Sequence, residues 1–320
     1  MNSPVFTAAA LFLVFAITVN AQSTASSRPT GMPAANSKPA LAPTAGQASL
    51  GAAKTAPIVN SLGMEFVAVP GTKIYMCRTV TRVKDFRSFA EATGYHQKGG
   101  MFVLKVKDGE PEEIEDHHAT WDHPGFAQGE NEPVVGVTWK TAQAFCAWMT
   151  TKEARKYRLP TDQEWSAAAG HGKYPWGDLW PPPKGAGNFA DESLAKLAPG
   201  NDWVLVAKNY DDGAMRTSPV GSYPANALGL FDMAGNVWQW CEDPYKASMN
   251  SPDILEKNAE LKDERNSRGL PYRVARGSSW SDVEEYALRT AHRLGVDEDT
   301  PGDLNGFRCV IAVGEMPLPK

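Results

Sequence analysis

The spacing of apolar residues predicts three helices in the first half of the chain. The first is expected between Thr81, which can cap it, and Gly94, which can end it. The second is expected from about Thr138. The third begins at Thr161, where Thr161 and Glu164 form a capping box. The residues that define the apolar faces of the first two helices are Val83, Phe86, Phe89 and Ala90, then Ala142, Phe145, Cys146 and Met149.

The rest of the folded chain shows weaker periodicity. An apolar run over residues 64–69, followed by Pro70 and Gly71, is typical of a strand that ends in a turn. After Gly170 the helical signals fade, and short segments punctuated by Gly and Pro continue to the C-terminus. Ten Trp and 28 Gly residues favour a loop-rich fold in which indole rings hold irregular segments together.

The N-terminus has the pattern of an export signal. Residues 8–19 form an apolar run, and a small-x-small site at residues 19–21 would leave Gln22 as the first mature residue. We therefore expect a signal peptide over residues 1–21 and a periplasmic or extracellular protein. The alternative is a buried helix or a membrane anchor, although the run is short for a span. No second stretch is long enough to cross a bilayer, so no membrane span is expected after signal removal.

Composition then sets the domain boundaries. Residues 22–57 are dominated by Ala, Pro, Ser and Thr, which cannot bury enough apolar surface to offset the entropy of ordering, so a disordered tether is predicted there. One domain is expected over residues 58–320. The net charge of −5 lacks the basic footprint of nucleic-acid binders, so no nucleic-acid partner is expected.

Six sequence blocks occur in an order that resembles a known family. They are GVTW with AFCAW (136–148), RLPT with EW (158–165), YPWGD (174–178), GLFDMAGNVWQW (229–240), RGSSW (276–280) and NGFRC (305–309). Together they resemble the sulfatase-modifying-factor family, which includes the formylglycine-generating enzymes. The resemblance implies an α+β fold: a single compact domain with low regular secondary structure and C-type-lectin-like architecture.

The resemblance also exposes a difference at the active site. The family places a pair of copper-binding catalytic cysteines where this chain has Asp282 and Ala287. Copper(I) is held by soft sulfur ligands, and neither a carboxylate nor a methyl group can replace them. Copper is therefore not expected here. We expect Asp282 and Ala287 to flank a shallow groove whose floor includes Ser279 and Trp280.

Calcium is implied by the same resemblance, because the family binds it through loop carbonyl and side-chain oxygens. The matching positions form two sets: Asn188, Phe189, Asp212 and Ala214 in the first, and Asp232, Gly235, Val237 and Gln239 in the second. For the first set, the alternative is a plain turn at residues 211–213. In the second set, the Gln239 amide stands where the family usually has a carboxylate, and Asp232 can restore the negative charge.

Four cysteines remain to be placed. The resemblance implies a structural disulfide between Cys146 and Cys309, which an exported protein can form. Cys77 and Cys241 have no family partner. They are either a second pair or two buried thiols that act as small apolar side chains.

Three functions are compatible with these residues. The intact framework without catalytic thiols favours an exported binding or scaffold module for a protein or glycan ligand. The first alternative is a formylglycine-generating oxidase that acts on sulfatase cysteines. The second is a non-haem iron oxidase that uses His117, His118 and His123, although the loop around His123 is common to the family. The acidic residues 297–299 with Asp303 could form a contact surface, a cation site or a solvated loop.

Overall fold

The computed structural model describes residues 56–107, 110–197, 199 and 205–314. The predicted signal peptide and nearly all of the predicted tether lie outside these residues. Within the described part of the chain, no helix is both long and apolar enough to span a membrane.

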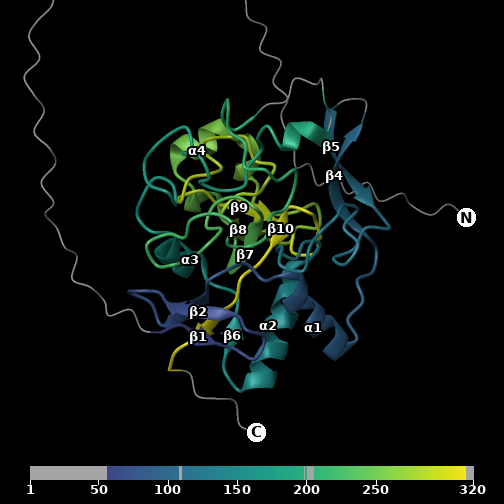
Figure 1. The fold of residues 1–320 in the computed structure, drawn as a ribbon, viewed down its shortest axis with the longest axis vertical. Coiled ribbons are helices and arrows are strands. Elements are labelled where there is room, and N and C mark those ends of the chain that lie inside the picture. Colours follow the sequence, from purple (N-terminus) through teal and green to yellow (C-terminus); the bar gives the residue numbers. More distant parts are fainter. Residues whose placement is uncertain (1–55, 108–109, 198, 200–204, 315–320) are drawn as a thin grey trace, which may run out of the picture.

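Two small sheets form the centre of the fold (Figure 1). The first is antiparallel and has the strand order β1-β2-β3-β11-β6, so the last strand of the chain lies between two early ones. Its strands are β1 (Ile58–Val59), β2 (Glu65–Ala68), β3 (Ile74–Cys77), β11 (Val310–Ala312) and β6 (Tyr157–Arg158). The predicted strand at residues 64–69 is thus observed as β2.

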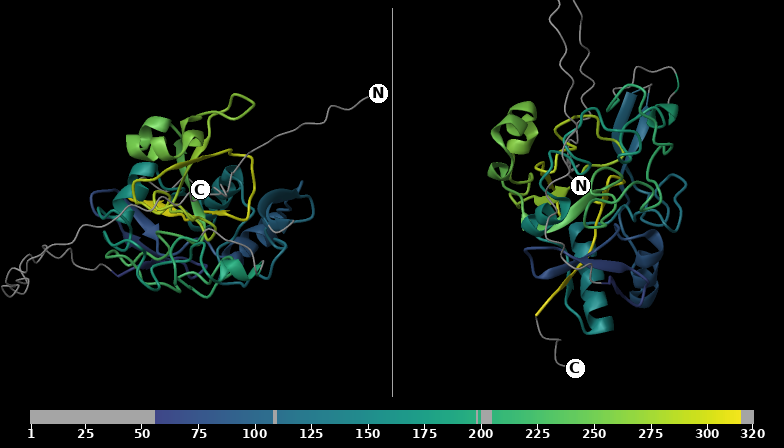
Figure 2. Two further views of the ribbon diagram at one scale, coloured as in Figure 1. Left: turned by 90° about the horizontal axis from the view of Figure 1, so that it is seen from above. Right: turned by 60° about the vertical axis from the view of Figure 1, so that its left-hand side comes forward.

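The second sheet has the order β10-β7-β8-β9, with β10 and β7 parallel and the other pairs antiparallel. A separate hairpin projects at the side of the domain (Figures 1 and 2) and was not predicted from the sequence. The strands are β10 (Asn305–Gly306), β7 (Trp238–Pro244), β8 (Arg273–Arg276) and β9 (Leu294–Val296), and in the hairpin β4 (Met101–Lys107) and β5 (Glu110–Asp116).

The three predicted helices are present. The described residues contain α1 (Val83–Thr93), α2 (Trp139–Glu153), α3 (Asp162–Ala169) and the short α4 (Pro252–Lys257), with 3₁₀ turns at η1 (Leu194–Leu197), η2 (Ala247–Met249) and η3 (Ala259–Lys262). Thr138 caps α2 by accepting a hydrogen bond from the Thr141 N–H, and the capping box of Thr161 and Glu164 opens α3.

The predicted N-cap of α1 is wrong by one residue. Arg82 occupies that position, and its N–H donates to the Asp85 carboxylate over 3.1 Å. The Thr81 backbone is engaged elsewhere, since its N–H donates to Phe307 and its carbonyl accepts from Val134. Gly94 ends the helix in the left-handed conformation, as expected.

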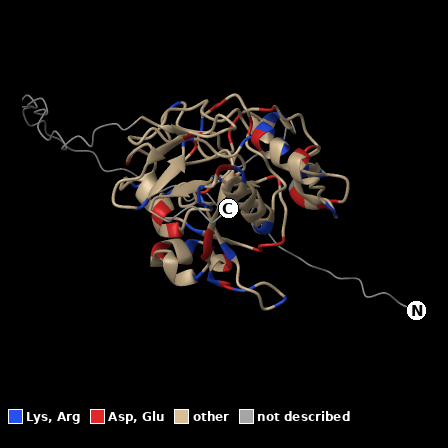
Figure 3. Cartoon of the chain, turned by 90° about the horizontal axis from the view of Figure 1, so that it is seen from below, with Lys and Arg blue, Asp and Glu red and all other residues tan. Residues whose placement is uncertain are grey.

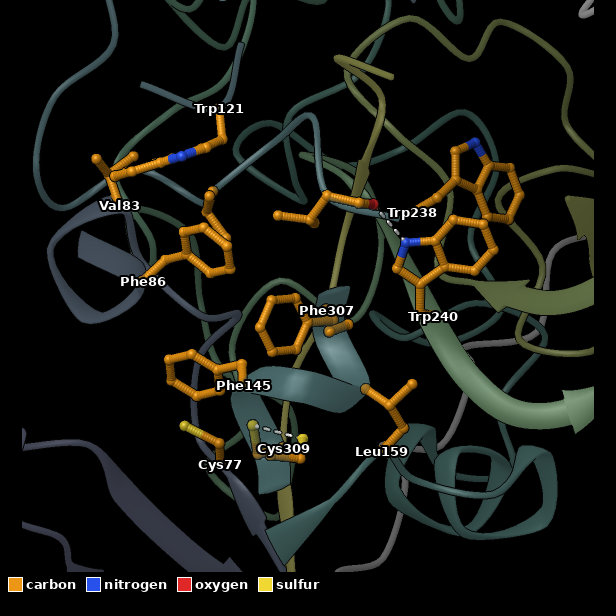
Figure 4. Close-up of a cluster of buried hydrophobic side chains, with 14 of the residues drawn as sticks. Cys77, Val83, Phe86, Trp121, Phe145, Leu159, Trp238, Trp240, Phe307 and Cys309 are labelled. Carbon is orange, nitrogen blue, oxygen red and sulfur yellow. Dashed lines mark hydrogen bonds between the residues drawn. The ribbon is translucent and has the colours of Figure 1, made fainter. Parts of the chain in front are cut away.

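The main core lies between α1, α2 and the C-terminal segment (Figure 4). All the apolar positions predicted for α1 and α2 are buried. Phe86 stacks on Phe145 at 6.2 Å between ring centroids, and Phe145 meets Phe307 edge to face at 5.3 Å. Aromatic pairs of this kind stabilise a fold beyond the area they bury. The structure is therefore the mixed α/β domain, with limited regular structure, that the sequence predicted.

Candidate functional site

The Asp282 carboxylate belongs to a tight turn that follows β8. One of its oxygens accepts hydrogen bonds from both the N–H and the hydroxyl of Ser279, each over 2.6 Å. Burial raises the pKa of Asp282 to about 6, while the bonds from Ser279 act in the opposite direction. A carboxylate at this position therefore closes the turn by accepting local hydrogen bonds.

The side chains predicted to form a groove floor are buried instead. Ser279 and Trp280 are 0% and 1% exposed, and Ala287, at 6%, packs in an apolar cluster with Phe189 and Tyr286. The indole N–H of Trp280 points inward and donates to the Asp303 carbonyl over 3.2 Å. Ser279 and Trp280 thus do not line an open groove, because the surrounding loops pack against them.

Two cavities in the described part of the chain lie by the β4–β5 hairpin. One, of about 310 Å³, is bordered by Leu104, Phe126 and Arg216. The other, of about 270 Å³, is bordered by Tyr95 and Thr138 among others. Neither is lined by Ser279, Trp280, Asp282 or Ala287.

The four thiols are all buried and lie in other parts of the core. Cys77, Cys146 and Cys309 share the main cluster, whereas Cys241 belongs to a second cluster around Trp165. Burial raises the pKa of Cys77 to about 12 and raises the pKa of Cys241 well above its usual range. Burial thus favours the neutral thiol in both residues. Cys77 and Cys241 thus behave as small apolar side chains.

The predicted disulfide pair is close but not bonded. The Cys146 and Cys309 sulfur atoms are 3.4 Å apart (Figure 4), whereas a disulfide requires about 2.05 Å. Both residues are at most 1% exposed. The disulfide remains a prediction for the oxidised protein.

The first set of predicted calcium ligands is brought together by hydrogen bonds. The Asp212 carboxylate accepts from the N–H groups of Phe189 and Ala214 over 2.9 and 2.8 Å. Asn188 is fully buried, and its amide nitrogen donates to the Arg216 carbonyl. Its side-chain oxygen has no donor among the described residues. A buried oxygen without a donor fits a cation ligand.

Asp191 is a further acidic residue in this set, and the sequence analysis did not identify it. Its carboxylate accepts from the Asp212 N–H, and it is itself fully buried. Burial and the neighbouring Asp191 charge raise the pKa of Asp212 to about 7. Two carboxylates that repel each other and an unpaired amide oxygen are donor types that suit calcium, although every oxygen of the two carboxylates already accepts a backbone N–H. Asn188, Asp191 and Asp212 are the residues that would hold it.

The second set has a different arrangement. The Gln239 side-chain oxygen accepts from the Trp165 indole over 2.9 Å and from the Arg308 guanidinium over 2.7 Å. Its amide nitrogen donates to the Asp232 carbonyl, to which Arg308 also donates. Both acceptor positions of the oxygen are used, and a cationic side chain already lies beside them. These contacts do not fit a calcium ion.

Val237 and Gly235 of the second set have structural roles, in the core and at a close approach between two backbone segments. Val237 is fully buried within the core. Gly235 has φ +76°, and a Cβ atom there would lie 2.1 Å from the Asn188 carbonyl oxygen. Only glycine fits such an approach. Asp232 accepts from the Gly221 N–H with one oxygen, and its other oxygen is buried without a donor among the described residues.

The histidines proposed for iron do not converge. The side chains of His117 and His123 are 72% and 82% exposed, and each lies beside its own neighbouring carboxylate. In the described residues no three His, Cys, Asp or Glu side chains gather to hold a metal ion. His118 is also exposed. The geometry therefore does not support a three-histidine iron centre.

One buried histidine was missed. His292 is 3% exposed, and its ring lies 5.5 Å from the rings of Trp238 and Tyr286. Burial and three nearby arginines lower its pKa to about 3, so the ring is neutral. In the sequence, His292 lies between Arg289 and Arg293, and nothing in this segment predicts that its side chain is buried.

The acidic segment 297–299 is neither a free surface nor a cation site. Asp297 and Asp299 accept from Arg268, and Glu298 pairs with Arg273. In the cartoon of Figure 3, positions of basic and acidic residues are interspersed along the chain. Asp303, in contrast, is fully buried.

Comparison with known proteins gives consistent results. Residues 41–313 match the sulfatase-modifying factor enzyme 1-like domain. The chain is 30% identical to the inactive Cα-formylglycine-generating enzyme 2 of Bos taurus over 73% of its length and 75% of the relative. It is also 30% identical to the formylglycine-generating enzyme of Streptomyces coelicolor, over 70% and 73% of the two chains.

Two further matches concern larger or more distant proteins. The chain is 36% identical to the serine/threonine-protein kinase Pkn1 of Chlamydia trachomatis over 58% of its length, but spans only 25% of that kinase. The solved structure of Treponema denticola variable protein 1 superposes with a TM-score of 0.50 at 16% identity, covering 82% of this chain and all of that one. The latter likeness concerns the fold alone.

Proposed function

The chain belongs to the family of sulfatase-modifying factor enzyme 1-like domains, and we propose that it is an exported binding or scaffold module without copper-dependent oxidase activity. One observation carries this proposal. The two positions that hold catalytic thiols in the active family members are filled here by Asp282, which closes a turn, and by Ala287, which packs in the core.

The alternative oxidase function would need another pair of soft ligands. The described cysteines are buried, and burial raises the pKa of Cys77 and Cys241, which disfavours the thiolate. Cys146 and Cys309 face each other inside the core and not the Asp282 turn. The match to an inactive relative, at the same identity as to an active enzyme, is consistent with a lost activity.

Ligand binding would then use other surfaces of the domain. The two cavities beside the β4–β5 hairpin are the hollows that the geometry supports best for a protein or glycan partner. Export rests on the sequence pattern of residues 1–21. Calcium, if bound through Asn188, Asp191 and Asp212, would fix the loops that carry these residues and take no part in a reaction.

The test is an oxidation assay with a matched variant. The purified protein is incubated with copper and a peptide that contains Cys-x-Pro-x-Arg, and mass spectrometry follows the peptide cysteine. We expect no aldehyde product. The Asp282→Cys/Ala287→Cys double variant is the control, and it should gain copper(I) binding because it restores a pair of soft ligands. Aldehyde formation by the unaltered protein would overturn the proposal.

A further inference from the structure

Three oxygen-bearing side chains meet where the β4–β5 hairpin packs on the segment before β10. Asp303 is fixed along the edge of β4, because its N–H donates to the Phe102 carbonyl and its carboxylate accepts from the Leu104 N–H, each over 3.0 Å. Glu113 stands opposite Leu104 in the hairpin register. Asn305 follows two residues after Asp303, at the start of β10.

The backbone of Gly302 shows how close these groups are. A Cβ atom built on Gly302 would lie 3.4 Å from the Asn305 amide nitrogen and 3.9 Å from one Glu113 carboxylate oxygen. Asp303 is the next residue in the chain. The two carboxylates and the carboxamide therefore surround one short stretch of main chain, although Glu113 is separated from the others by about 190 residues of sequence.

Each of the three side chains has one buried oxygen without a donor among the described residues. These atoms are Glu113 Oε2, Asp303 Oδ1 and Asn305 Oδ1. Asp303 and Asn305 are 0% and 4% exposed. A buried acceptor that lacks a partner is costly, and three such acceptors on side chains that border one short stretch of main chain indicate a ligand that supplies positive charge.

The protein itself neutralises only one of the two carboxylates. Arg216 donates to the second oxygen of Asp303 over 3.1 Å and to the Leu104 carbonyl over 2.7 Å, and its guanidinium lies 5.1 Å from the Trp280 ring. No cationic side chain pairs with Glu113 among the described residues. Burial and the Asp303 charge raise the pKa of Glu113 to about 8.

We propose that Glu113, Asp303 and Asn305 form a binding site for a hard divalent cation of the calcium or magnesium class. Two carboxylates and a carboxamide are the oxygen donors that such ions prefer. The ion would balance the charge of Glu113 and use the three acceptor oxygens together. It would also tie the hairpin to the loop before β10. This site shares no residue with the Asn188–Asp191–Asp212 set.

Trp280 provides a direct spectroscopic test. Its indole donates to the Asp303 carbonyl, so a terbium ion bound beside Asp303 should give luminescence sensitised by tryptophan. We expect that calcium displaces terbium and that Glu113→Gln weakens terbium binding at least tenfold. The matched control is Glu115→Gln on the same strand, where the carboxylate is 52% exposed; it should bind terbium as the unaltered protein does. The terbium measurements all use an Asp212→Asn background, because the Asn188–Asp191–Asp212 set can also hold a hard cation.

A second variant excludes simple loss of folding. Asn305→Asp adds a third carboxylate, so it should lower the melting temperature in chelator and tighten cation binding several-fold. The competing explanation is a proton shared by Glu113 and Asp303. In that case the protein with the Asp212→Asn background alone shows no terbium signal, and adding Glu113→Gln, which can donate a hydrogen bond, matches or exceeds its stability in chelator. That result, or an equal cation response in Glu113→Gln, would overturn the proposal.

Discussion

The two loop regions that carry the predicted calcium ligands differ in whether a protein side chain supplies positive charge beside the ligand oxygens. Around Asp232 and Gln239, the Arg308 guanidinium supplies it, and the Gln239 oxygen is saturated. Around Asn188 and Asp212, two carboxylates lie together beside an amide oxygen that has no donor among the described residues. Similar residue types therefore form an arginine-bridged core in one region and a cation-compatible set in the other.

The difference teaches that ligand chemistry alone does not identify a metal site. An amide or carboxylate oxygen can accept from an arginine as readily as it can bind calcium. What separates the cases is the charge beside the oxygens: the Arg308 guanidinium lies at Gln239, whereas the Asp191 and Asp212 carboxylates accept backbone N–H groups. Arg308 is fully buried and donates to Cys77 and Phe231 carbonyls as well, so it acts as a permanent bridge between segments. The following predictions test this contrast.

The largest loss in the free energy of unfolding is expected for Arg308→Met. This substitution removes a buried guanidinium, leaves the Phe231 carbonyl without a donor, and removes one of the two donors to the Gln239 oxygen and to the Asp232 carbonyl. We expect a loss of about 3–5 kcal/mol in the free energy of unfolding, measured by urea denaturation. The loss should be the same with calcium and with chelator. A variant that regained stability only in calcium would show that an ion can replace the arginine.

The next effect concerns calcium at the first set. Calcium should stabilise the unaltered protein by about 2.7 kcal/mol when its concentration is 100 times the Kd, because the ion binds only the folded state. Asp212→Asn should abolish most of this gain. Asp211→Asn is the matched control, since Asp211 is exposed and its side chain bonds to Ser193. Equal calcium responses in both variants would contradict the assignment.

A smaller effect is expected for Gln239→Ala. The substitution leaves the Trp165 indole N–H and one Arg308 N–H without their acceptor. The cost should be about 1–3 kcal/mol. Thermal unfolding with and without calcium measures both the size of the loss and its independence of the ion. A loss that appeared only in calcium would mean that the second set binds it after all.

The smallest effect is a dependence on pH. The pKa of Asp212 in the folded state is raised to about 7, above its value in the unfolded chain. In chelator, the stability contributed by protonated Asp212 is thus complete below about pH 4 and is lost as the pH rises through about 7. Calcium should reduce this decline, and Asp212→Asn should flatten it. Urea titrations across this range would show no such slope if the pKa were unchanged on folding, and a slope of the opposite sign if the pKa were lowered.

Local signals explain which parts of the fold the sequence could predict. Helices α2 and α3 begin where their capping residues are, because the bonds involved span only three residues. The N-cap of α1 was misplaced because Thr81 pairs with Phe307, more than 200 residues away. The β4–β5 hairpin was missed because its buried positions depend on the loop at residues 301–303 that packs along it.

The candidate sites show the same limit. Asn188 and Asp212 were identified through a resemblance, but Asp191 joins them only because of the fold. The burial of Ser279 and Trp280 depends on packing by distant loops and has no signature in their own segment. Gln239 was assigned to a calcium set through the resemblance, whereas its contact with Arg308, which lies between β10 and β11, depends on the fold. The sequence therefore identified residues of the candidate sites more reliably than it identified the groups that these residues contact.

The position of β11 determines when the domain can be completed during synthesis. This strand is the last one among the described residues, yet it lies between β3 and β6 and pairs with both. A growing chain thus has β1, β2 and β3 long before the strand that joins them to β6. The sheet must stay open until residues 310–312 have left the ribosome, and a truncation before residue 310 should leave a chain that cannot close it.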